Sequence, residues 1–325
     1  DRLRSRGLGD VYKRQVMGTA MAGIATIAYT QEALTGASHK KVGPRFIPKI
    51  LGNIAAANIA IDYNIQGPSF TVSTACSSGG DAINTACMCM QSGKADIMLA
   101  VGAESVLCPL VIYSLANAKA LSRRNDSPST ASRPFDVTRD GFVIGEGGGA
   151  LVLETEEHAL ARGAKIYAEI RGCGNTDDAY HVTAPHPEGR GAIACMKQAI
   201  AEAGINPSDI GYINAHGTAT NKGDTVETSS IKKVFGNTLP YVSSTKGATG
   251  HMMGAGGITE TITCVKAIET GTVPPTINLN EVDPECAGID FVANTAKKAE
   301  INFAMSNAFG FGGQNSSIIV GKYGK

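Results

Sequence analysis

The chain has 325 residues, of which 43% are hydrophobic and 18% are charged, a composition typical of globular proteins. Its 29 basic and 29 acidic residues give a formal net charge of zero, which argues against a nucleic-acid or anionic-membrane partner. No apolar run reaches the roughly 18 residues of a membrane-spanning helix, so we predict no membrane span. The length allows one large domain or two fused ones.

Residues 1–15 differ abruptly in composition from the chain that follows. They are rich in Arg, and residues 6–15 resemble translated sequencing-adapter DNA. Together with the apolar residues 16–25 they imitate a secretory signal peptide, but this apolar segment is rich in Gly and contains no Leu. We therefore predict that residues 1–15 are a non-native tail.

Strands and helices alternate after this tail, which predicts an α/β fold. The first stretch is short, because no clear βαβ unit precedes Cys76. A charged helix near residue 158 then separates two α/β stretches, so we divide the chain into residues 16–157 and 158–325. In the first stretch we predict strands at residues 70–72, 97–102 and 148–154 and a helix at residues 82–90.

The second stretch shows clearer periodicity. Ile193, Met196 and Ile200 recur at spacings of three and four, which indicates an amphipathic helix. The predicted helices are residues 191–203, 225–235 and 254–268, and the predicted strands are residues 166–170, 210–214, 241–243, 289–292, 302–306 and 316–320.

The eight cysteines form no CxxC pair and no repeating spacing. Several lie in apolar stretches, such as Cys87 and Cys89. This pattern is typical of small buried side chains in a reducing compartment and not of disulfides. We therefore expect a cytoplasmic protein.

Cys76 lies at the junction between a predicted strand and a predicted helix. Residues 73–80 are all small, which leaves room for a bulky acyl group. A free thiol has a pKa of about 8.5, and the positive end of a helix dipole favours the nucleophilic thiolate. Cys76 is therefore a candidate nucleophile, and the alternative is an inert core cysteine.

Two histidines, His216 and His251, each follow a predicted strand. Ligands bind at the carboxyl ends of strands in α/β sheets, so both are candidate active-site residues. Each can also be a hydrogen-bonded structural histidine. A metal site that combines them with Asp224 and Glu227 is a weaker alternative, because HxxxH and HxH spacings are missing.

Two further segments are rich in glycine. Residues 307–315 lie between the last two predicted strands, where glycines expose backbone N–H groups that can complete an oxyanion hole. A plain hairpin is the alternative. Residues 145–149 lead into a strand and not into a helix, so they do not form a dinucleotide or phosphate motif.

Together these segments resemble the Cys-His-His condensing enzymes of the thiolase fold, the β-ketoacyl synthases of fatty-acid elongation. The resemblance extends from Val16 to the C-terminus, and residues 178–187 favour the type II branch. The matching motifs are residues 74–79 around Cys76, 131–136, 139–147, 178–187, 214–218 around His216, 246–251 ending at His251, and 307–313.

The resemblance implies a thiolase-like five-layered α-β-α-β-α duplication of two similar halves. About 100 residues of the family's amino-terminal part have no counterpart here, so we expect the first half to be incomplete. A sheet without its opening strands has an unpaired edge and exposed apolar faces. A truncated, inactive fragment is therefore one alternative. The resemblance also implies a homodimer.

The reaction implied is the decarboxylative Claisen condensation of acyl-carrier protein with malonyl-carrier protein, without metal or bound cofactor; the phosphopantetheine arrives on the carrier protein. By resemblance Cys76 takes up the acyl group, His216 and His251 donate N–H groups to the enolate oxygen, and the backbone N–H groups of Cys76 and Phe311 form the oxyanion hole. The other implied roles are fixed charge for Lys246, structural support for Glu260, pantetheine binding for Thr183, Thr218 and Thr220, and carrier-protein contact for Lys119.

Four other interpretations stay open on the sequence alone. A polyketide ketosynthase uses the same three residues. A biosynthetic thiolase is expected to have a second catalytic cysteine near the last glycine-rich loop, and no cysteine follows Cys286. A Cys-His hydrolase would release free acid. A non-catalytic chain-length-factor-like subunit typically lacks the nucleophile that this chain has at Cys76.

Overall fold

The computed structural model describes residues 13–36 and 41–324. Residues 1–12 of the predicted non-native tail lie outside the described residues, and the foreign origin of the tail stays a prediction. The last three tail residues begin strand β1 (Lys13–Gly18). Gln15 is fully buried there, and its side-chain amide is hydrogen-bonded to a backbone carbonyl at 2.6 Å. These three positions are therefore part of a sheet.

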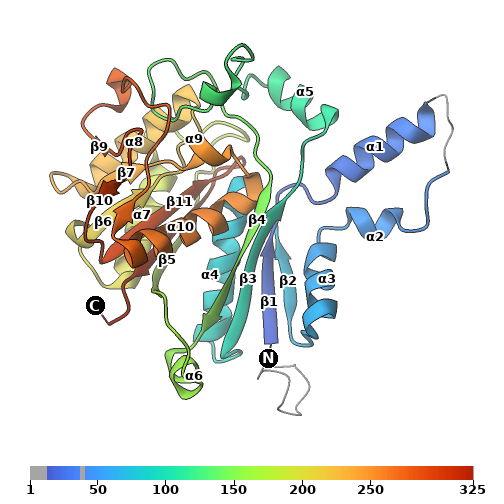
Figure 1. Ribbon diagram of the computed structural model, residues 1–325, viewed down its shortest axis with the longest axis horizontal. Helices are drawn as coiled ribbons and strands as arrows, with labels where there is room; N and C mark the ends of the chain where they lie inside the picture. Colours follow the sequence, from blue (N-terminus) through green and yellow to red (C-terminus); the bar gives the residue numbers. More distant parts are fainter. Residues whose placement is uncertain (1–12, 37–40, 325) are drawn as a thin grey trace.

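The amino-terminal half contains a four-stranded sheet in the order β2-β1-β3-β4 (Figure 1). β1 pairs in parallel with β2 and β3, whereas β4 is antiparallel to β3. The other strands are β2 (Ser69–Val72), β3 (Ile97–Glu104) and β4 (Gly147–Glu154). The three strands predicted here are confirmed to within two residues.

The sheet opens with a βαβ unit, so the expectation that none precedes Cys76 is wrong. β1 and β2 are connected by α1 (Ile24–Thr35), α2 (Phe46–Ile50) and α3 (Ile54–Tyr63). No residue of α1 is buried, and only Ala56 is buried in α3. Apolar residues that surround a helix on all sides leave no amphipathic period to detect in the sequence.

The carboxyl-terminal half contains a six-stranded sheet in the order β5-β12-β11-β6-β7-β9. β11 is parallel to β6 and antiparallel to β12, and β12 is antiparallel to β5. Its strands are β5 (Glu169–Asp177), β6 (Ile210–Asn214), β7 (Tyr241–Ser243), β9 (Asp290–Phe291), β11 (Phe303–Phe309) and β12 (Gln314–Gly321). The predicted limits of β6 and β7 are confirmed to the residue.

β5 starts later than predicted, because residues 166–170 were expected to begin the strand. The strand begins at Glu169 and continues to Asp177, because its pairing with β12 runs from Gly321 to Gln314. The extent of a strand is thus set by its partner, which lies more than 130 residues away and which periodicity cannot show.

Both halves repeat one topology. In each, a βαβ unit gives two parallel strands, and a helix then leads to a third parallel strand and an antiparallel fourth. β1, β2, β3 and β4 correspond in this way to β6, β7, β11 and β12. Within the described residues, β5 has no counterpart beside β4. This arrangement is the five-layered duplication with an incomplete first half that the resemblance implies.

The layer between the two sheets consists of α4 (Ser78–Gln91) and α10 (Gly256–Thr270) (Figure 1). α4 leads directly into β3, whereas β8 (Thr272–Val273), β9 and β10 (Lys297–Lys298) lie between α10 and β11 in the chain. Glycines let the two helices touch backbone to backbone, because a Cβ at Gly79 would lie 2.7 Å from the backbone N of Ile258. The helix predicted at residues 82–90 is α4, and that predicted at residues 254–268 is α10.

The remaining helices are α5 (Pro109–Asn117), α6 (Glu156–Ala161), α7 (Arg190–Ala203), α8 (Asn221–Phe235) and α9 (Lys246–Thr249). α7 packs on β5 and β12 and confirms the helix predicted at residues 191–203. α8 begins four residues before its predicted start at residue 225. The predicted division after residue 157 falls inside α6, which connects β4 to β5.

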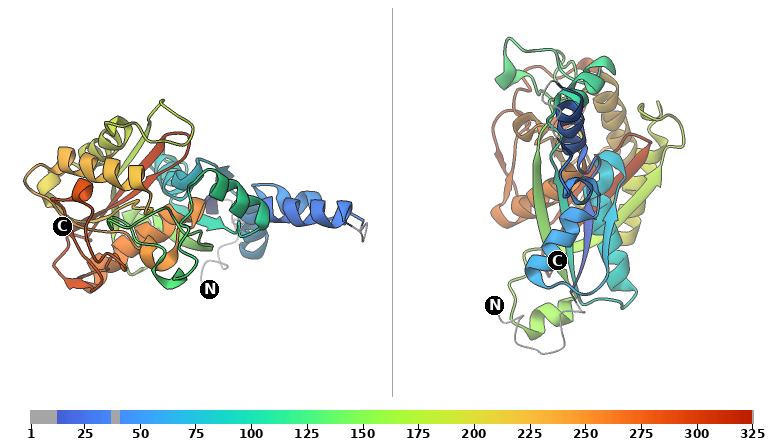
Figure 2. Two further views of the ribbon diagram at one scale, coloured as in Figure 1. Left: turned by 90° about the horizontal axis from the view of Figure 1, so that it is seen from above. Right: turned by 90° about the vertical axis from the view of Figure 1, so that its right-hand side faces the viewer.

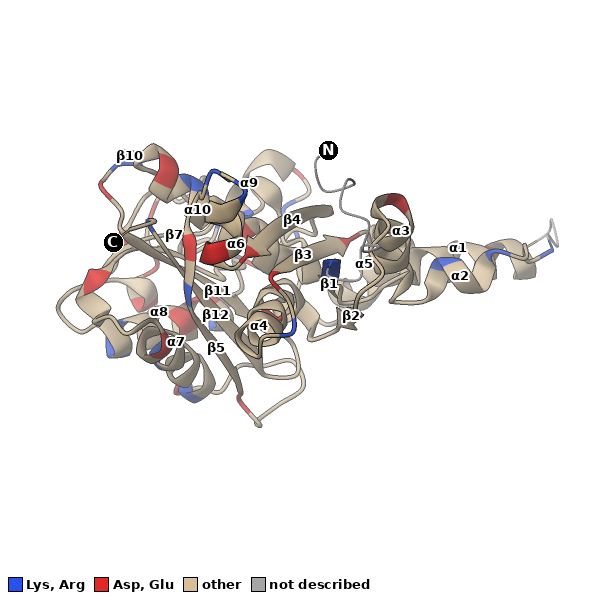
Figure 3. Ribbon diagram, turned by 90° about the horizontal axis from the view of Figure 1, so that it is seen from below, with Lys and Arg blue, Asp and Glu red and all other residues tan. Residues whose placement is uncertain are grey.

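α1 and α2 project from the body of the molecule (Figure 2). The charged residues described in this arm are mainly basic, with Lys41, Arg45 and Lys49 against Glu32, whereas acidic and basic residues are interspersed over the larger part (Figure 3). Across residues 13–36 and 41–324, no helix has both the length and the apolar character needed to cross a membrane.

Candidate active site

Cys76 lies in a tight turn between β2 and α4. The turn Ala75–Ser77 is one short 3₁₀ helix, and Ala75 has a φ of 51°, a left-handed conformation that costs a non-glycine residue about 1–2 kcal/mol. The Ser78 hydroxyl accepts from the backbone N–H of Thr74 at 2.9 Å and donates to the carbonyl of Ala75 at 2.7 Å. These bonds hold the elbow that presents Cys76 at the start of α4.

The Cys76 thiol is buried, with 7% of the residue exposed. Burial raises its pKa to about 11, although the backbone N–H of Phe311 and the charge of Lys246 act to lower it. The increase in thiol pKa caused by burial is therefore larger than the decrease expected from the helix dipole, which the sequence analysis took to favour the thiolate. Roughly one thiol in 10⁴ is ionised at pH 7 with such a pKa.

His251 is in direct contact with this thiol, since its Nε2 lies 3.0 Å from Cys76 Sγ. The His251 backbone N–H donates to the carbonyl of Val143 at 2.7 Å, and its carbonyl accepts from Gly145 at 2.9 Å. These bonds fasten a residue of the carboxyl-terminal half to a loop of the amino-terminal half. The Phe142 ring packs edge-on against the imidazole, with centroids 5.2 Å apart.

His216 lies beside His251, with ring centroids 5.3 Å apart and the rings nearly perpendicular. It follows β6, and its turn is held by the buried Glu227, whose carboxylate accepts from the backbone N–H groups of His216 at 2.8 Å and Gly217 at 2.7 Å. The structure therefore brings the two imidazoles and the thiol together, although β2, β6 and β7 deliver them from distant parts of the chain.

Both imidazoles are neutral at pH 7. Burial, reinforced by the charge of Lys246, holds the pKa of His216 and that of His251 well below the usual range. The Nδ1 atom of each ring is buried without a hydrogen-bond partner. An unpaired acceptor is tolerated better than an unpaired N–H, so the hydrogen belongs on Nε2. Each ring then offers an N–H donor, and that of His251 points at Cys76.

Lys246 and Glu260 form a buried ion pair next to the histidines. Lys246 is 1% exposed and Glu260 3%, and the ammonium contacts Glu260 Oε1. The carbonyl of Lys246 also accepts from Ser132 at 2.6 Å, which fixes α9 against the amino-terminal half. The pair thus places one fixed positive charge within electrostatic reach of both imidazoles and of the thiol, as the pKa shifts of all three groups show.

The glycine-rich loop after β11 closes over Cys76. A Cβ at Gly310 would lie 2.8 Å from the carbonyl of Thr74 and 3.2 Å from the backbone N of Cys76, so only glycine allows this approach. The backbone N–H of Phe311 is hydrogen-bonded to the Cys76 sulfur. An oxyanion hole formed by the backbone N–H groups of Cys76 and Phe311 stays a prediction.

Comparisons with known proteins identify the family. Residues 6–159 match the family model "Beta-ketoacyl synthase, N-terminal domain", and residues 167–280 match "Beta-ketoacyl synthase, C-terminal domain". The chain is 45% identical over 311 residues to 3-oxoacyl-[acyl-carrier-protein] synthase 2 of Rhizobium meliloti (strain 1021), which covers 95% of this chain and 73% of that protein. This chain belongs to the beta-ketoacyl synthase family. It is a condensing acyltransferase of the thiolase-like fold.

Other relatives of this synthase agree. The mitochondrial 3-oxoacyl-[acyl-carrier-protein] synthase of Arabidopsis thaliana is 44% identical over 309 residues, covering 93% of this chain and 67% of that protein. Among solved structures, a beta-ketoacyl synthase from Burkholderia phymatum STM815 superposes with a TM-score of 0.91 at 34% identity, covering 98% of this chain and 77% of that one. A type II polyketide ketosynthase in complex with its acyl-carrier protein has a TM-score of 0.92 at 34% identity, covering 98% and 80%.

The synthase places its predicted pantetheine residues in two loops. Thr218 and Thr220 follow His216, and their hydroxyls lie 3.0 Å apart. Thr183 is exposed on the loop after β5, next to Val182, whose carbonyl accepts from Gly312 of the glycine-rich loop at 2.8 Å. Both loops border the elements around Cys76, and the binding roles of these threonines stay predictions.

Lys119 is exposed directly after α5, in a left-handed conformation with a φ of 56°. The next residue, Ala120, accepts a backbone hydrogen bond from Phe142, the residue that packs on His251. Lys119 is therefore on the outer side of a wall of the site, where a contact with a carrier protein stays a prediction.

Asp224 and Glu227, the acidic residues of the alternative metal site, accept hydrogen bonds from the backbone instead. Glu227 binds backbone N–H groups, and Asp224 accepts from the backbone of Phe135 at 2.8 Å and of Ala219 at 3.1 Å. Within the described part of the chain, no three His, Cys, Asp or Glu side chains are arranged to hold a metal ion.

Glu104 is a site residue that the sequence analysis missed. This buried carboxylate at the end of β3 accepts from the Thr19 hydroxyl at 3.0 Å and from the backbone N–H groups of Ala20 at 2.5 Å and Gly254 at 3.1 Å. It therefore ties β1 to the start of α10 beside Cys76. No motif marks a lone Glu at a strand end, so only the fold shows this role.

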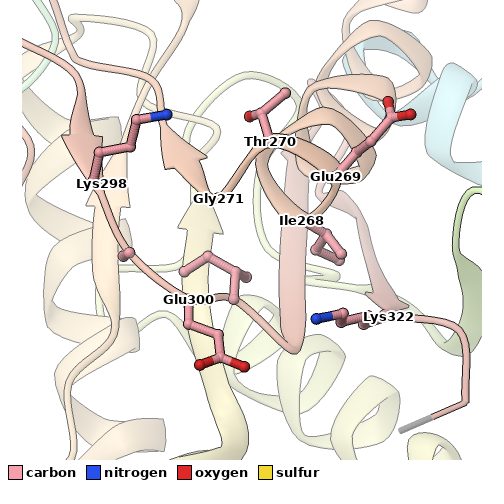
Figure 4. Close-up of a pocket in the computed structure, with 9 residues that line it drawn as sticks. Ile268, Glu269, Thr270, Gly271, Lys298, Glu300 and Lys322 are labelled. Atoms are coloured by element: carbon pink, nitrogen blue, oxygen red, sulfur yellow. The ribbon is translucent and has the colours of Figure 1, made fainter.

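Neither of the two cavities described is lined by Cys76, His216 or His251, although Thr19 and Glu104 line one of them. One, of about 570 Å³, is lined by Ile268, Glu269, Thr270, Gly271, Lys298 and Glu300 among others (Figure 4). The other, of about 720 Å³, lies between β1, β3, β4 and the connection from α2 to α3. Neither contains a predicted site residue.

Proposed function

We propose that this chain is a 3-oxoacyl-[acyl-carrier-protein] synthase II, which joins an acyl group to a two-carbon unit from malonyl-carrier protein in fatty-acid elongation. The observation that carries the proposal is the convergence of one thiol and two neutral imidazoles, with His251 Nε2 at 3.0 Å from Cys76 Sγ. The names of the relatives that share 43–45% identity support the substrate class.

In the first half-reaction Cys76 Sγ attacks the thioester carbonyl of the acyl-carrier protein. A bond forms between Sγ and the acyl carbon, the bond from that carbon to the pantetheine sulfur breaks, and the thiol proton ends on the departing sulfur. The backbone N–H groups of Cys76 and Phe311 stabilise the oxyanion of the tetrahedral intermediate. The reaction exchanges one thioester for another and needs no metal or bound cofactor.

An apolar cluster beside Cys76 suits the acyl chain. Its buried members are Val106, Cys108, Val111, Phe142 and Met253, and small apolar residues of α1 pack against it. Burial of each methylene contributes about 0.8 kcal/mol, so contact with this cluster favours longer acyl groups over an acetyl group.

In the second half-reaction malonyl-carrier protein loses carbon dioxide. The bond to the carboxylate breaks, its electron pair forms an enolate, and the Nε2–H groups of His216 and His251 stabilise the enolate oxygen. The enolate carbon then attacks the acyl-Cys76 carbonyl, the bond to Sγ breaks, and the departing thiolate takes up one proton from solvent to restore the thiol. Both histidines are neutral, so each stabilises the enolate oxygen by a hydrogen bond from its single N–H group.

A polyketide ketosynthase is the second candidate. Its support is the 0.92 TM-score with a type II polyketide ketosynthase. That structure shares 34% identity with this chain, whereas the fatty-acid synthases share up to 45%. The higher identity favours fatty-acid elongation.

The proposal also names an acyl-carrier protein as partner, a homodimer as the assembly and the cytoplasm as the compartment. All eight cysteines are free, as in a reducing compartment. The solved complex of a related ketosynthase with its carrier protein supports the partner.

Mass spectrometry of the intact chain tests this function. The protein is incubated with saturated acyl-carrier proteins of different chain length and then with malonyl-carrier protein. We expect an acyl adduct on Cys76, which malonyl-carrier protein discharges as a product two carbons longer. Release of free fatty acid would indicate a hydrolase, and repeated extension without reduction would indicate a polyketide ketosynthase.

A further inference from the structure

Asp81 is a buried carboxylate that the proposed reaction does not use. It lies in the first turn of α4 and is 4% exposed. Its Oδ2 accepts from the Thr74 hydroxyl at 2.5 Å and from the Ser77 hydroxyl at 3.1 Å. Thr74 and Ser77 bracket the turn that contains Cys76, so one carboxylate oxygen holds both sides of the elbow.

The other oxygen of Asp81 reaches the opposite half of the molecule. Asp81 Oδ1 accepts from the side-chain amide of Asn175 at 2.6 Å, and Asn175 lies on β5 of the carboxyl-terminal sheet. β5 pairs along its length with β12, which follows the loop that holds Phe311. The chain Thr74–Asp81–Asn175 therefore connects the thiol elbow to the half that supplies both imidazoles.

These contacts involve neutral partners, and burial raises the pKa of Asp81 while the hydrogen bonds from Thr74, Ser77 and Asn175 lower it. A buried carboxylate costs free energy unless its lone pairs are satisfied. Asp81 meets this condition, because its carboxylate accepts hydrogen bonds from three side chains at the start of the helix that follows Cys76.

We propose that Asp81, through its bonds to Thr74 and Asn175, is a positioning residue that sets the Cys76 thiol against His251. The inference rests on Cys76 being the nucleophile of the proposed function. A displacement of the order of 1 Å between reacting groups costs about a hundredfold in rate, so loss of this link is expected to slow reaction at Cys76 while leaving the fold in place.

The test exchanges the two side chains. Asn175→Asp places two carboxylates in contact, which repel each other unless they share a proton. Adding Asp81→Asn restores one acceptor and one donor across the gap. We expect Asn175→Asp alone to slow iodoacetamide labelling of Cys76 by about tenfold or more, and the double variant to return to within about threefold of the starting protein.

A pH series separates positioning from general loss of structure. In Asn175→Asp the labelling rate, taken relative to the starting protein at each pH, is expected to recover as the pH falls and the two carboxyls share a proton. Gln91→Glu is the matched control, because Gln91 at the other end of α4 donates to Glu202 at 3.2 Å. That variant is expected to leave Cys76 labelling unchanged.

Peptide mass spectrometry assigns labelling to Cys76, so this readout does not depend on any condensation activity. If the starting protein fails to condense but the labelling pattern holds, the proposed function fails and the positioning role stands. Failure of the double variant to restore labelling overturns the role. If Asn175→Asp does not fold, Thr74→Val is tested instead, because it removes the hydroxyl that donates to Asp81. Unchanged labelling of Cys76 in Thr74→Val would also overturn the positioning role.

Discussion

The two halves of this molecule share one topology, but the sheet of the amino-terminal half has fewer strands than that of the carboxyl-terminal half. The carboxyl-terminal sheet has β5 beside β12 and α7 packed on both, whereas β4 has no described strand at its outer edge. The nucleophile lies on the less complete half and both imidazoles on the more complete one. The reacting groups nevertheless meet, because they lie along the central layer of α4 and α10, where both halves are whole. The site thus depends on contacts across this seam and not on the outer edges of the sheets.

The largest effect is expected from removing the contribution of the amino-terminal half. Cys76→Ala deletes the sulfur that must carry the acyl group, so acyl transfer should fall by about three orders of magnitude or more. Mass spectrometry after incubation with acyl-carrier protein measures the adduct. Cys108→Ala is the control, because Cys108 is buried in the same apolar cluster. An acyl adduct on another cysteine would contradict the assignment.

Breaking the ion pair of the carboxyl-terminal half should mainly affect stability. Glu260→Ala leaves the buried ammonium of Lys246 without its partner, which typically costs about 3–5 kcal/mol. Urea unfolding of both proteins measures the difference in free energy. Glu269→Ala removes an exposed carboxylate paired with Lys165 and Lys266 and should cost much less, because water screens these pairs. If both variants lose the same free energy of unfolding, the buried ion pair contributes no more to stability than the exposed one.

The two histidines should separate the half-reactions. His216→Ala or His251→Ala removes one donor to the enolate oxygen, a loss typically worth about 3–4 kcal/mol, or a hundredfold to a thousandfold in decarboxylation. Release of labelled carbon dioxide from malonyl-carrier protein measures this step. His158→Ala on α6 is the control, because His158 pairs with Glu154 away from the site. Unchanged carbon dioxide release would exclude the donor roles.

The pH dependence of thiol labelling reports the burial of Cys76. Because burial raises its pKa to about 11, the thiolate fraction should increase about tenfold for each pH unit between pH 7 and 10. Iodoacetamide labelling followed by peptide mass spectrometry gives the profile. A plateau below pH 9 would mean that the helix start and the Phe311 N–H outweigh burial.

The smallest effect concerns the unequal edges of the two sheets. Backbone N–H groups of β4 that face away from β3 have no described strand to pair with, whereas β12 is paired on both sides. Amide hydrogen exchange should therefore be faster in β4 than in β12, by about tenfold or more at the outward-facing amides. Equal protection would indicate that another chain covers β4, for instance through self-association.

Much of this protein can be predicted from local sequence. β6 and β7 were predicted to the residue, because a short apolar run bounded by turn residues is sufficient to mark a buried strand. The α1–α3 connection was not predicted, since its apolar residues show no period. The start of β5 was misplaced because β12 sets its limits. Cys76, His216 and His251 were all found as candidates, but Glu104 was missed and Asp81 was given no role, because a single buried carboxylate leaves no pattern in sequence.

Local sequence establishes which chemical groups are present and in what setting: a cysteine among small residues, two histidines after strands, and a glycine-rich loop. The tertiary fold brings the thiol and the two imidazoles into contact in the protein interior. Burial then set their charge states, with the thiol pKa raised and the imidazole pKa values lowered. The physical reason is that desolvation and contact distance depend on segments as far apart as Cys76 and His251, which no local pattern can bring together.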